Sequence, residues 1–466
     1  MLGLRAEITD TIAPAKLSIF MRVASNSSRR KVRPSTTAER SYIWKLWGLV
    51  AAGASALGPG LVTGAADDDP SGIATYSQIG AQSGFTMLWT LVLTYPLMAA
   101  IQEVSAWIGR VTGAGLARNM KLHYPVWVSY SVLTLLLFAN VINLAADIGA
   151  MAAALFLIVG GPSLLYSVLF GAICLSAEVV VPYSRFAQVL KWTTLVLFVY
   201  VATAFVIRIP LRAVLMGTFV PSITLSGGYL TALTAVLGTT ISPYLFFWQA
   251  SQEVQEQKAA PAEKPLKRAP EQGPAQLHKM RADTYLGMAF SNIVAFFIVL
   301  DTGALLHTHG ITDIQTAAQA ASALRPLAGD FAFLLFSIGI IGTGLLAIPV
   351  LSGSLGYAMA EIRGWPTGLD RSLPKARRFY AAIAAVTVLG VGLNFTPINP
   401  IKALYWSAVI NGLSAGPIMI VMMLMTTNRK VTGGVRLPKP QWVVGWISTG
   451  VMLAVAAAMI VGVAVG

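Results

Sequence analysis

Long apolar segments, each able to cross a lipid bilayer, make up over half of this sequence of 466 residues. The hydrocarbon core of a membrane is about 30 Å thick, and an α-helix spans it with about 20 residues. Only 11% of the residues are charged, against about 25% in soluble domains. Backbone in lipid satisfies its hydrogen bonds only within helices or closed barrels, and runs of this length indicate helices. The expected fold class is therefore an all-α polytopic membrane protein.

Eleven spans are expected, and polar residues and proline interrupt the first and the sixth. The spans are 44–81, 85–108, 125–157, 163–182, 186–207, 226–256, 285–305, 331–359, 379–396, 402–426 and 441–465. The single cysteine, Cys174, excludes a disulfide framework and a paired-cysteine metal or redox site.

Basic residues divide very unevenly between the two sides that these spans define. Of the 33 Lys and Arg residues, 29 lie in residues 1–45 or in the connections after even-numbered spans, including the flanking helix ends. The positive-inside rule then predicts an inner (plasma) membrane protein with its N-terminus in the cytoplasm and its C-terminus outside. The net charge of +14 is interpreted as this topology signal and not as nucleic-acid binding. We expect the protein to be embedded in the lipid bilayer, and the sequence indicates no obligatory protein partner.

Two polar segments flank or divide the membrane domain. Residues 1–43 are rich in Ser and Arg and lack a continuous apolar stretch, which predicts a flexible basic cytoplasmic tail. Residues 44–466 form the expected transmembrane domain. Within it, residues 257–283 are rich in Pro, Lys and Glu and predict a cytoplasmic loop.

The interruptions of the first and sixth spans fall at matching places. The first break contains Pro70, Ser71 and Gly72, and the second contains Pro243. Because the breaks lie five spans apart, 44–207 and 226–426 are expected to be inverted repeats, with 441–465 added. Paired interrupted helices are a sequence sign of a transporter binding site. The alternative is two ordinary proline kinks.

Three consecutive acids, Asp67, Asp68 and Asp69, lie at the first break. A carboxylate at membrane depth costs several kcal/mol unless it is compensated, and three together do not all remain ionised and unpaired. A divalent cation is the expected compensation, because carboxylate and carbonyl oxygens are its ligands. The alternative is a polar helix end at the membrane surface. Asp147, deep in the third span, is a candidate for the ion path.

Both breaks resemble those of the NRAMP divalent-metal transporters. GPGLVTGAADDDPSGIATYSQIGAQSG resembles the first span of that family with its DPGN motif, and GTTISPYLFFWQA resembles its second broken helix with a Met-Pro-His motif. The segments QEVSAWIGRVTGAGLA and LAADIGA are also similar. The resemblance implies a leucine-transporter-like fold with alternating access. It also implies that the protein is not an enzyme and has no resident cofactor.

Four departures from the family pattern favour its magnesium-transporting branch. Gly72 stands where the family has a ligand Asn, Ser242 where it has Met, Tyr244 where it has His, and Ala150 where it has a second acid. A thioether favours soft metal ions, so its loss leaves an oxygen site, which we expect to be wider. The resemblance therefore implies transport of Mg²⁺, and also Mn²⁺, without proton coupling.

The expected ion site combines side chains and backbone of both breaks. It comprises Asp69 as the direct ligand, Asp67 and Asp68 as added charge, carbonyls near Ala66 and from Thr239 to Ile241, pocket residues Gly72, Ser242 and Tyr244, and Asn411 from the tenth span. Three other functions remain open. They are a proton-coupled Mn²⁺ or Fe²⁺ importer, a sodium-coupled organic solute symporter on the same fold, and an intramembrane hydrolase.

Overall fold

The computed structural model describes residues 59–181 and 193–465, and all regular structure within these ranges is helical. The α-helices are α3 (Pro59–Asp67), α4 (Pro70–Ser83), α5 (Leu88–Thr112), α6 (Leu116–His123), α7 (Val126–Val159), α8 (Ser163–Val180), α10 (Phe198–Val206), α11 (Leu211–Phe219), α12 (Gly227–Thr240), α13 (Pro243–Ala259), α14 (Gly273–Leu305), α15 (Ala317–Ser322), α16 (Arg325–Ala328), α17 (Ala332–Arg363), α18 (Arg377–Leu393), α19 (Pro400–Thr427), α20 (Arg429–Thr432) and α21 (Lys439–Val465).

The chain is a multi-pass membrane protein. Among the described residues, 8 helical stretches are long and apolar enough to cross a membrane, and α12 with α13 counts as one of them. The first expected span appears as the short helices α3 and α4, and its beginning lies outside the described residues. The fifth span is described only in its second half, as α10, and the ninth is α18 with 17 residues. The count of eleven spans remains a prediction, as does the predicted tail 1–43, which lies outside the described residues.

Within the predicted loop 257–283, both ends are helical. Helix α13 ends at Ala259 and α14 begins at Gly273, with a proline in the first turn of α14 where its missing N–H is not needed. The shorter connection that remains is attached to the end of α5. Leu266 and Lys267 donate their backbone N–H groups to the carbonyls of Arg110 and Val111, at 3.1 Å each. Composition predicted a linker without such contacts, because hydrogen bonds between segments far apart in the sequence leave no sign in composition.

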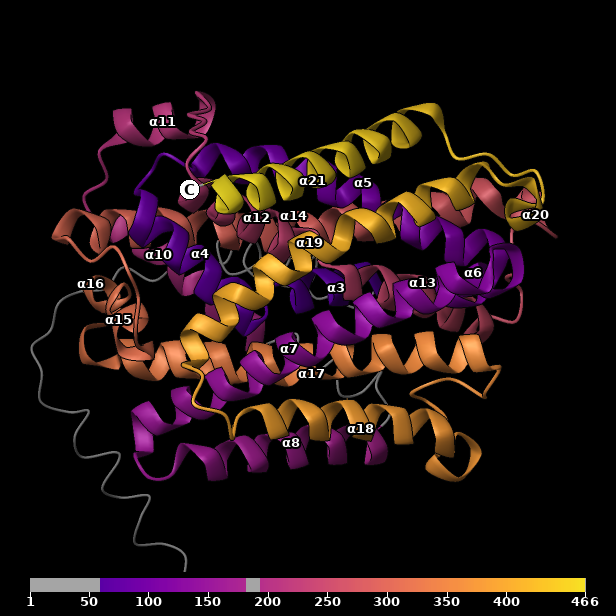
Figure 1. Cartoon of the computed structure of the whole chain (residues 1–466), viewed down its shortest axis with the longest axis horizontal. Helices are drawn as coiled ribbons and strands as arrows, with labels where there is room; N and C mark the ends of the chain where they lie inside the picture. Colours follow the sequence, from indigo (N-terminus) through magenta and orange to yellow (C-terminus); the bar gives the residue numbers. More distant parts are fainter. Residues whose placement is uncertain (1–58, 182–192, 466) are drawn as a thin grey trace, which may run out of the picture. The chain divides into compact units, whose positions relative to one another are not determined.

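The broken helices are enclosed by the long ones (Figure 1). Helices α3 and α4 pack on α14, α12 packs on α19, and α13 packs on α5. Helix α7 lies against α17 and α19, while α8 and α18 lie side by side at one edge and α21 lies at the other. Polar backbone at the breaks is thereby held against protein and away from lipid, as irregular backbone at membrane depth requires.

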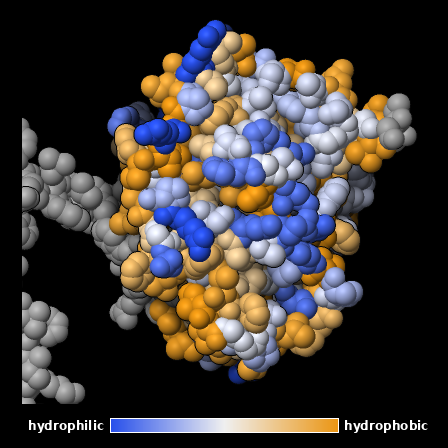
Figure 2. Space-filling model, turned by 90° about the vertical axis from the view of Figure 1, so that its left-hand side faces the viewer, coloured by the Kyte–Doolittle hydropathy of each residue, from blue (hydrophilic) through white to orange (hydrophobic). Residues whose placement is uncertain are grey.

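The two ends of the helical unit differ in charge. One end, called the basic end here, carries an ion-pair network around Arg110 of α5, which is 1% exposed. Its guanidinium donates to Glu253 at 2.5 Å, to Glu263 at 2.5 Å and to Glu256. The opposite end, called the far end, is seen in Figure 2. Hydrophilic residues gather over the middle of that face, with apolar residues around them.

Hydrogen bonds connect the Arg110 network to the first half-helix, α3. Gln249 of α13 donates to Glu253 at 2.8 Å, and Thr63 of α3 donates to Gln249. The N-terminus of α3 is held separately, because Asp283 of α14 accepts from the backbone N–H groups of Gly60 and Leu61, at 2.5 and 3.3 Å. Helix α3 is therefore fixed at the basic end by both α13 and α14.

Glycines let α3 and α14 meet backbone to backbone. A Cβ added to Gly64 would lie 2.2 Å from the carbonyl oxygen of Gly287, and one added to Gly287 would lie 2.2 Å from that of Gly60. No relaxation of a flexible side chain relieves such a contact, because the atoms met belong to the backbone. Because these positions lack side chains, α3 can pack closely against α14. This close packing fixes where α3 and the first break lie within the protein.

We predict that Gly287→Val lowers the stability of the folded protein by about 1–3 kcal/mol, because overpacking forces the two backbones apart. The measurement is the thermal unfolding midpoint of the purified protein in detergent. Gly450→Ala is the matched control, since a Cβ at this exposed position of α21 meets nothing within 4 Å. Equal midpoints for Gly287→Val and the unmodified protein would contradict the close crossing.

Candidate metal-ion site

The two breaks have the same construction. Helix α3 ends at Asp67 and α4 begins at Pro70, while α12 ends at Thr240 and α13 begins at Pro243. Each break is thus two residues long and is followed by a proline at the first helical position. Proline is favoured there, because its N–H would have no helical partner and its φ is already helical. The prolines therefore begin the second half-helices instead of kinking continuous ones.

Asp69 is fixed from three directions at the start of α4. Its Oδ1 accepts from the backbone N–H of Gly72 at 2.6 Å, which caps the helix. Its Oδ2 accepts from the amide of Asn143 at 3.1 Å and from the hydroxyl of Tyr244 at 3.2 Å. The residue is 3% exposed. A carboxylate at a helix N-terminus is stabilised by the helix dipole, so Asp69 is held as a preoriented anion.

Asp67 and Asp68 turn toward a different helix. The hydroxyl of Ser291 on α14 lies 2.7 Å from Asp67 Oδ2 and 2.9 Å from Asp68 Oδ1, and its single proton serves one of them at a time. The remaining oxygen of each carboxylate has no partner in the described part of the chain. Nor does any group of three His, Cys, Asp or Glu side chains there converge on a common metal position. The three predicted acids are close together, but they do not form one cage.

Helix α7 supplies two polar groups to the first break. Asp147 accepts from the backbone N–H of Ser71 at 3.1 Å, and Asn143, one turn earlier, donates to Asp69. Our sequence interpretation included Asp147 but missed Asn143 and Ser291. A signal for Asn143 was present, because residues four apart share one face of a helix. Ser291 is a small polar residue in a long apolar helix, and nothing in the sequence separates it from other serines.

The second break satisfies most of its own backbone. Ser242 donates to the carbonyls of Gly238 and Thr239, at 2.9 and 3.0 Å, and so covers the end of α12. The hydroxyl of Tyr244 lies 3.1 Å from the carbonyl oxygen of Ala66 and 3.2 Å from Asp69 Oδ2, and its single proton serves one of them at a time. The predicted carbonyls of Ala66 and Thr239 each lie within hydrogen-bond distance of a protein hydroxyl group.

The site is not wider at Gly72, contrary to our expectation. A Cβ there would lie 3.1 Å from the carbonyl oxygen of Asp67 and 3.3 Å from the hydroxyl of Thr239. The two breaks approach each other closely at this position, so the space of the missing side chain is already used. Gly72 contributes its backbone N–H to Asp69 and no ligand atom of its own.

Helix α19 contacts the first break through residues other than Asn411. The hydroxyl of Ser71 donates to the carbonyl of Leu404 at 3.1 Å and lies 2.9 Å from that of Ser407. Asn411 is buried, and its side-chain oxygen has no partner within the described ranges. A role for Asn411 at the ion site remains a prediction.

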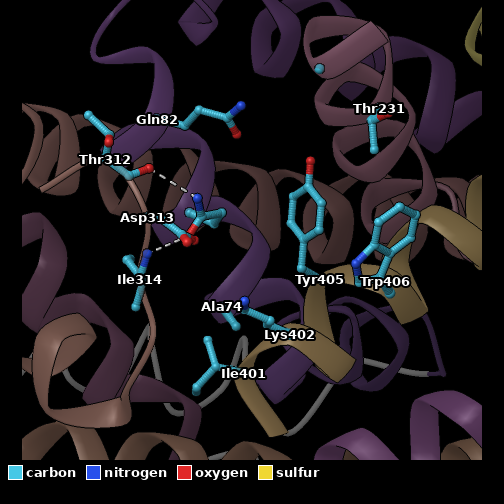
Figure 3. A pocket seen from close by; sticks show the side chains of 12 residues that line it. Ala74, Gln82, Thr231, Thr312, Asp313, Ile314, Ile401, Lys402, Tyr405 and Trp406 are labelled. Atoms are coloured by element: carbon cyan, nitrogen blue, oxygen red, sulfur yellow. Dashed lines mark hydrogen bonds between the residues drawn. The ribbon is translucent and has the colours of Figure 1, made fainter. Parts of the chain in front are cut away.

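A cavity of about 540 Å³ leads from the far end toward the first break. Figure 3 shows Tyr405 and Trp406 of α19 on one side of it and the segment Thr312–Ile314 on the other. Gln78 of α4 holds that segment, donating to the carbonyl of Thr312 at 3.2 Å and accepting from the N–H of Ile314 at 2.9 Å. Ala74, at the cavity wall, lies one helical turn from Pro70. The cavity thus ends about one turn of α4 from the first break, and Asp69 itself is buried.

Comparisons with known proteins point to one family. A family model described as natural resistance-associated macrophage protein-like (Nramp) matches residues 60–462. The divalent metal cation transporter MntH of Aeromonas hydrophila is 26% identical over 396 residues, covering 82% of this chain and 89% of that protein. MntH of Klebsiella pneumoniae is 26% identical over 426 residues, covering 88% and 94%.

Solved structures show the same fold. The Eremococcus coleocola manganese transporter, in complex with an aromatic bis-isothiourea substituted compound, superposes with a TM-score of 0.67 at 16% identity, covering 94% of this chain and 91% of that one. The nucleobase-cation-symport-1 family transporter Mhp1, in a closed conformation with bromovinylhydantoin bound, gives a TM-score of 0.50 at 14% identity, covering 87% and 92%. The fold is therefore leucine-transporter-like.

We predict that Tyr244→Phe destabilises the metal-free protein by about 1.5–3 kcal/mol, because a buried carboxylate loses one hydrogen-bond donor. A bound cation replaces that donor, so added divalent metal should raise the unfolding midpoint more in Tyr244→Phe than in the unmodified protein. Tyr405→Phe, at the cavity wall, is the control and should change neither quantity. An unchanged metal-free midpoint in Tyr244→Phe would show that the hydroxyl does not support Asp69.

Proposed function

Because the chain belongs to the Nramp family and carries divalent metal cations across the membrane, we propose that its principal cargo is Mg²⁺. Mn²⁺ is the second cargo, and transport runs by alternating access without proton coupling. We place the protein in the inner (plasma) membrane with its N-terminus in the cytoplasm, so that the far end faces outside. It is a transporter and not an enzyme.

The observation that carries this proposal is the chemistry of the groups around Asp69. Its hydrogen-bond partners are the amide of Asn143, the hydroxyl of Tyr244 and a backbone N–H. Ser242 stands at the second break and presents a hydroxyl. Hard oxygen ligands suit Mg²⁺, whereas thioether and imidazole groups favour softer metal ions. Among the described residues, no sulfur or imidazole group is hydrogen-bonded to Asp69.

Unpartnered oxygens favour an ion that keeps part of its water shell. Each of Asp67, Asp68, Asp147 and Asn143 has one buried side-chain oxygen without a hydrogen-bond partner among the described residues. Mg²⁺ dehydrates reluctantly and is usually held by one or two carboxylates together with several waters. Waters on the ion donate hydrogen bonds to such oxygens, which lowers the cost of burying them.

Transport follows from the two breaks and the cavity. The ion enters from outside through the cavity beside α4 and passes Ala74 to reach Asp69. Tilting of the half-helices then closes this path and opens one at the basic end, where Thr63 must separate from Gln249 for α3 to move. An inside-negative potential supplies about 2.3 kcal/mol per charge per 100 mV, so a divalent ion gains about twice that on uptake.

The absence of an imidazole at the breaks supports uncoupled transport. Tyr244 contacts Asp69 where the family pattern has His, and a tyrosine hydroxyl does not ordinarily titrate near neutral pH, its usual pKa being about 10. One observation favours the proton-coupled alternative. Asp147 is a fully buried carboxyl group beside the site, and such a group could carry a proton through the cycle.

We predict that proteoliposomes containing the protein take up Mg²⁺ and that Asp69→Ala abolishes this uptake, since the preoriented ligand is lost. An Mg²⁺-sensitive dye inside the vesicles measures uptake, and a pH-sensitive dye in parallel vesicles should report no inward proton flux. Asp330→Ala, an exposed acid outside the cavity lining, is the control and should retain at least half of the rate. Uptake unaffected by Asp69→Ala would refute the site, and proton flux matched to metal uptake would establish the coupled importer.

We predict that Ser242→Met shifts selectivity toward Mn²⁺ by about tenfold, because a thioether beside the break adds a soft ligand. The measurement is the ratio of Mn²⁺ to Mg²⁺ uptake rates in the same vesicles. Ser242→Leu matches the size of methionine without its sulfur and should leave the ratio near that of the unmodified protein. An equal shift in both variants would mean that volume, and not sulfur, sets the selectivity.

A further inference from the structure

We infer that the ion is held across the boundary between the first break and α7, with Asn143 Oδ1 and Asp147 Oδ2 as acceptors that bind it directly or through its water. This inference rests on the proposed function, because it assigns further ligands to the same cargo. It adds α7 to the two breaks as a third side of the ion site.

Asn143 and Asp147 are arranged in the same way. Each is fully buried on α7, and the two are one helical turn apart, about 6 Å along the axis. Each uses one side-chain atom on the first break, Asn143 by donating to Asp69 at 3.1 Å and Asp147 by accepting from Ser71 at 3.1 Å. Each keeps its second polar atom, an oxygen, without a partner among the described residues. Two open acceptors therefore lie on one face of α7 beside the capped carboxylate.

Open side-chain acceptors lie on the α7 side of the first break, whereas hydroxyl groups already contact several carbonyls around the breaks. Ser242 donates to the carbonyl of Gly238 or of Thr239 at the end of α12, and the hydroxyl of Tyr244 is shared between the carbonyl of Ala66 in α3 and Asp69. A cation that uses Asn143 Oδ1 and Asp147 Oδ2 displaces no hydrogen bond from those two oxygens. A buried acceptor without a partner costs about 1–3 kcal/mol, so binding on the α7 side recovers energy that the ion-free protein lacks.

This position would link two groups of helices through the ion. The first break is held by α14, against which both α3 and α4 pack, while α7 packs along α17. An ion between Asp69 and Asn143 therefore adds to the hydrogen bonds by which Asn143 and Asp147 already join the first break to α7.

Helix α7 also provides a matched comparison in Asn140, one turn before Asn143. Asn140 is fully buried and has one unpartnered oxygen, as Asn143 does. Its amide donates to the carbonyl of Leu351 at 2.9 Å and to the hydroxyl of Ser354 at 2.8 Å, both on α17. No carboxylate is hydrogen-bonded to Asn140 in the described structure, so its open oxygen is not expected to bind the ion. Asn140 is therefore a control with a structural role, against which the ligand role proposed for Asn143 can be tested.

The test is Mg²⁺ binding to the purified full chain, measured by titration calorimetry, for Asn143→Ala, Asp147→Asn and Asn140→Ala. We expect the first two variants to bind Mg²⁺ at least tenfold more weakly than the unmodified protein. Asn140→Ala should bind within twofold of it, although its unfolding midpoint falls. Asp147→Asn preserves the size of the side chain, which keeps the test informative if an alanine variant folds poorly.

Two failures are distinguishable. Normal Mg²⁺ binding in Asn143→Ala and Asp147→Asn, together with loss of binding in Asp69→Ala, would overturn the α7 position and leave the proposed function intact. Absence of Mg²⁺ binding in the unmodified protein, with Mn²⁺ binding retained, would overturn the proposed cargo and this inference with it.

Discussion

The structure depends on how unwound backbone is satisfied at membrane depth. In lipid a free N–H or C=O group costs several kcal/mol, so a broken helix survives only where side chains replace the missing bonds. At the first break Asp69 caps α4, and at the second Ser242 covers the carbonyls of α12. The two solutions differ in charge. The first leaves an anion and the second leaves a neutral turn, so we expect cation binding to concentrate at Asp69.

The position of the first break is set by contacts some distance from it. Gly64 and Gly287 allow α3 to approach α14 closely, and Asp283 holds the N-terminus of α3 at the basic end. Thr63 joins the same half-helix to Gln249 and so to the Arg110 network. These contacts hold α3 in place while the cavity beside α4 remains accessible from the far end. The asymmetry follows from short polar links at one end and an open volume at the other.

Sequence patterns predicted the membrane class, the two breaks and the capping acid, because apolar length, proline and buried charge act locally. They did not predict which groups the acids face. Asp67 and Asp68 are adjacent to Asp69 in the chain, yet they contact Ser291 on α14 while Asp69 contacts α7 and α13. The start of α14 at Gly273 and the close approach of Thr239 to Gly72 were missed for the same reason. Both depend on how helices pack, which composition does not encode.

The separation of the three acids has an electrostatic consequence for a divalent cargo. Asp67, Asp68, Asp69 and Asp147 are all buried, and so many carboxylates do not remain ionised together without a cation. In the proposed site, a dication at Asp69 would compensate two charges, and the carboxylates that face Ser291 would lie outside its direct ligands. They would contribute attraction without closing a tight cage, so the ion would keep water and the site could release it. A protein that must let its cargo go at every cycle benefits more from this arrangement than from three converging ligands.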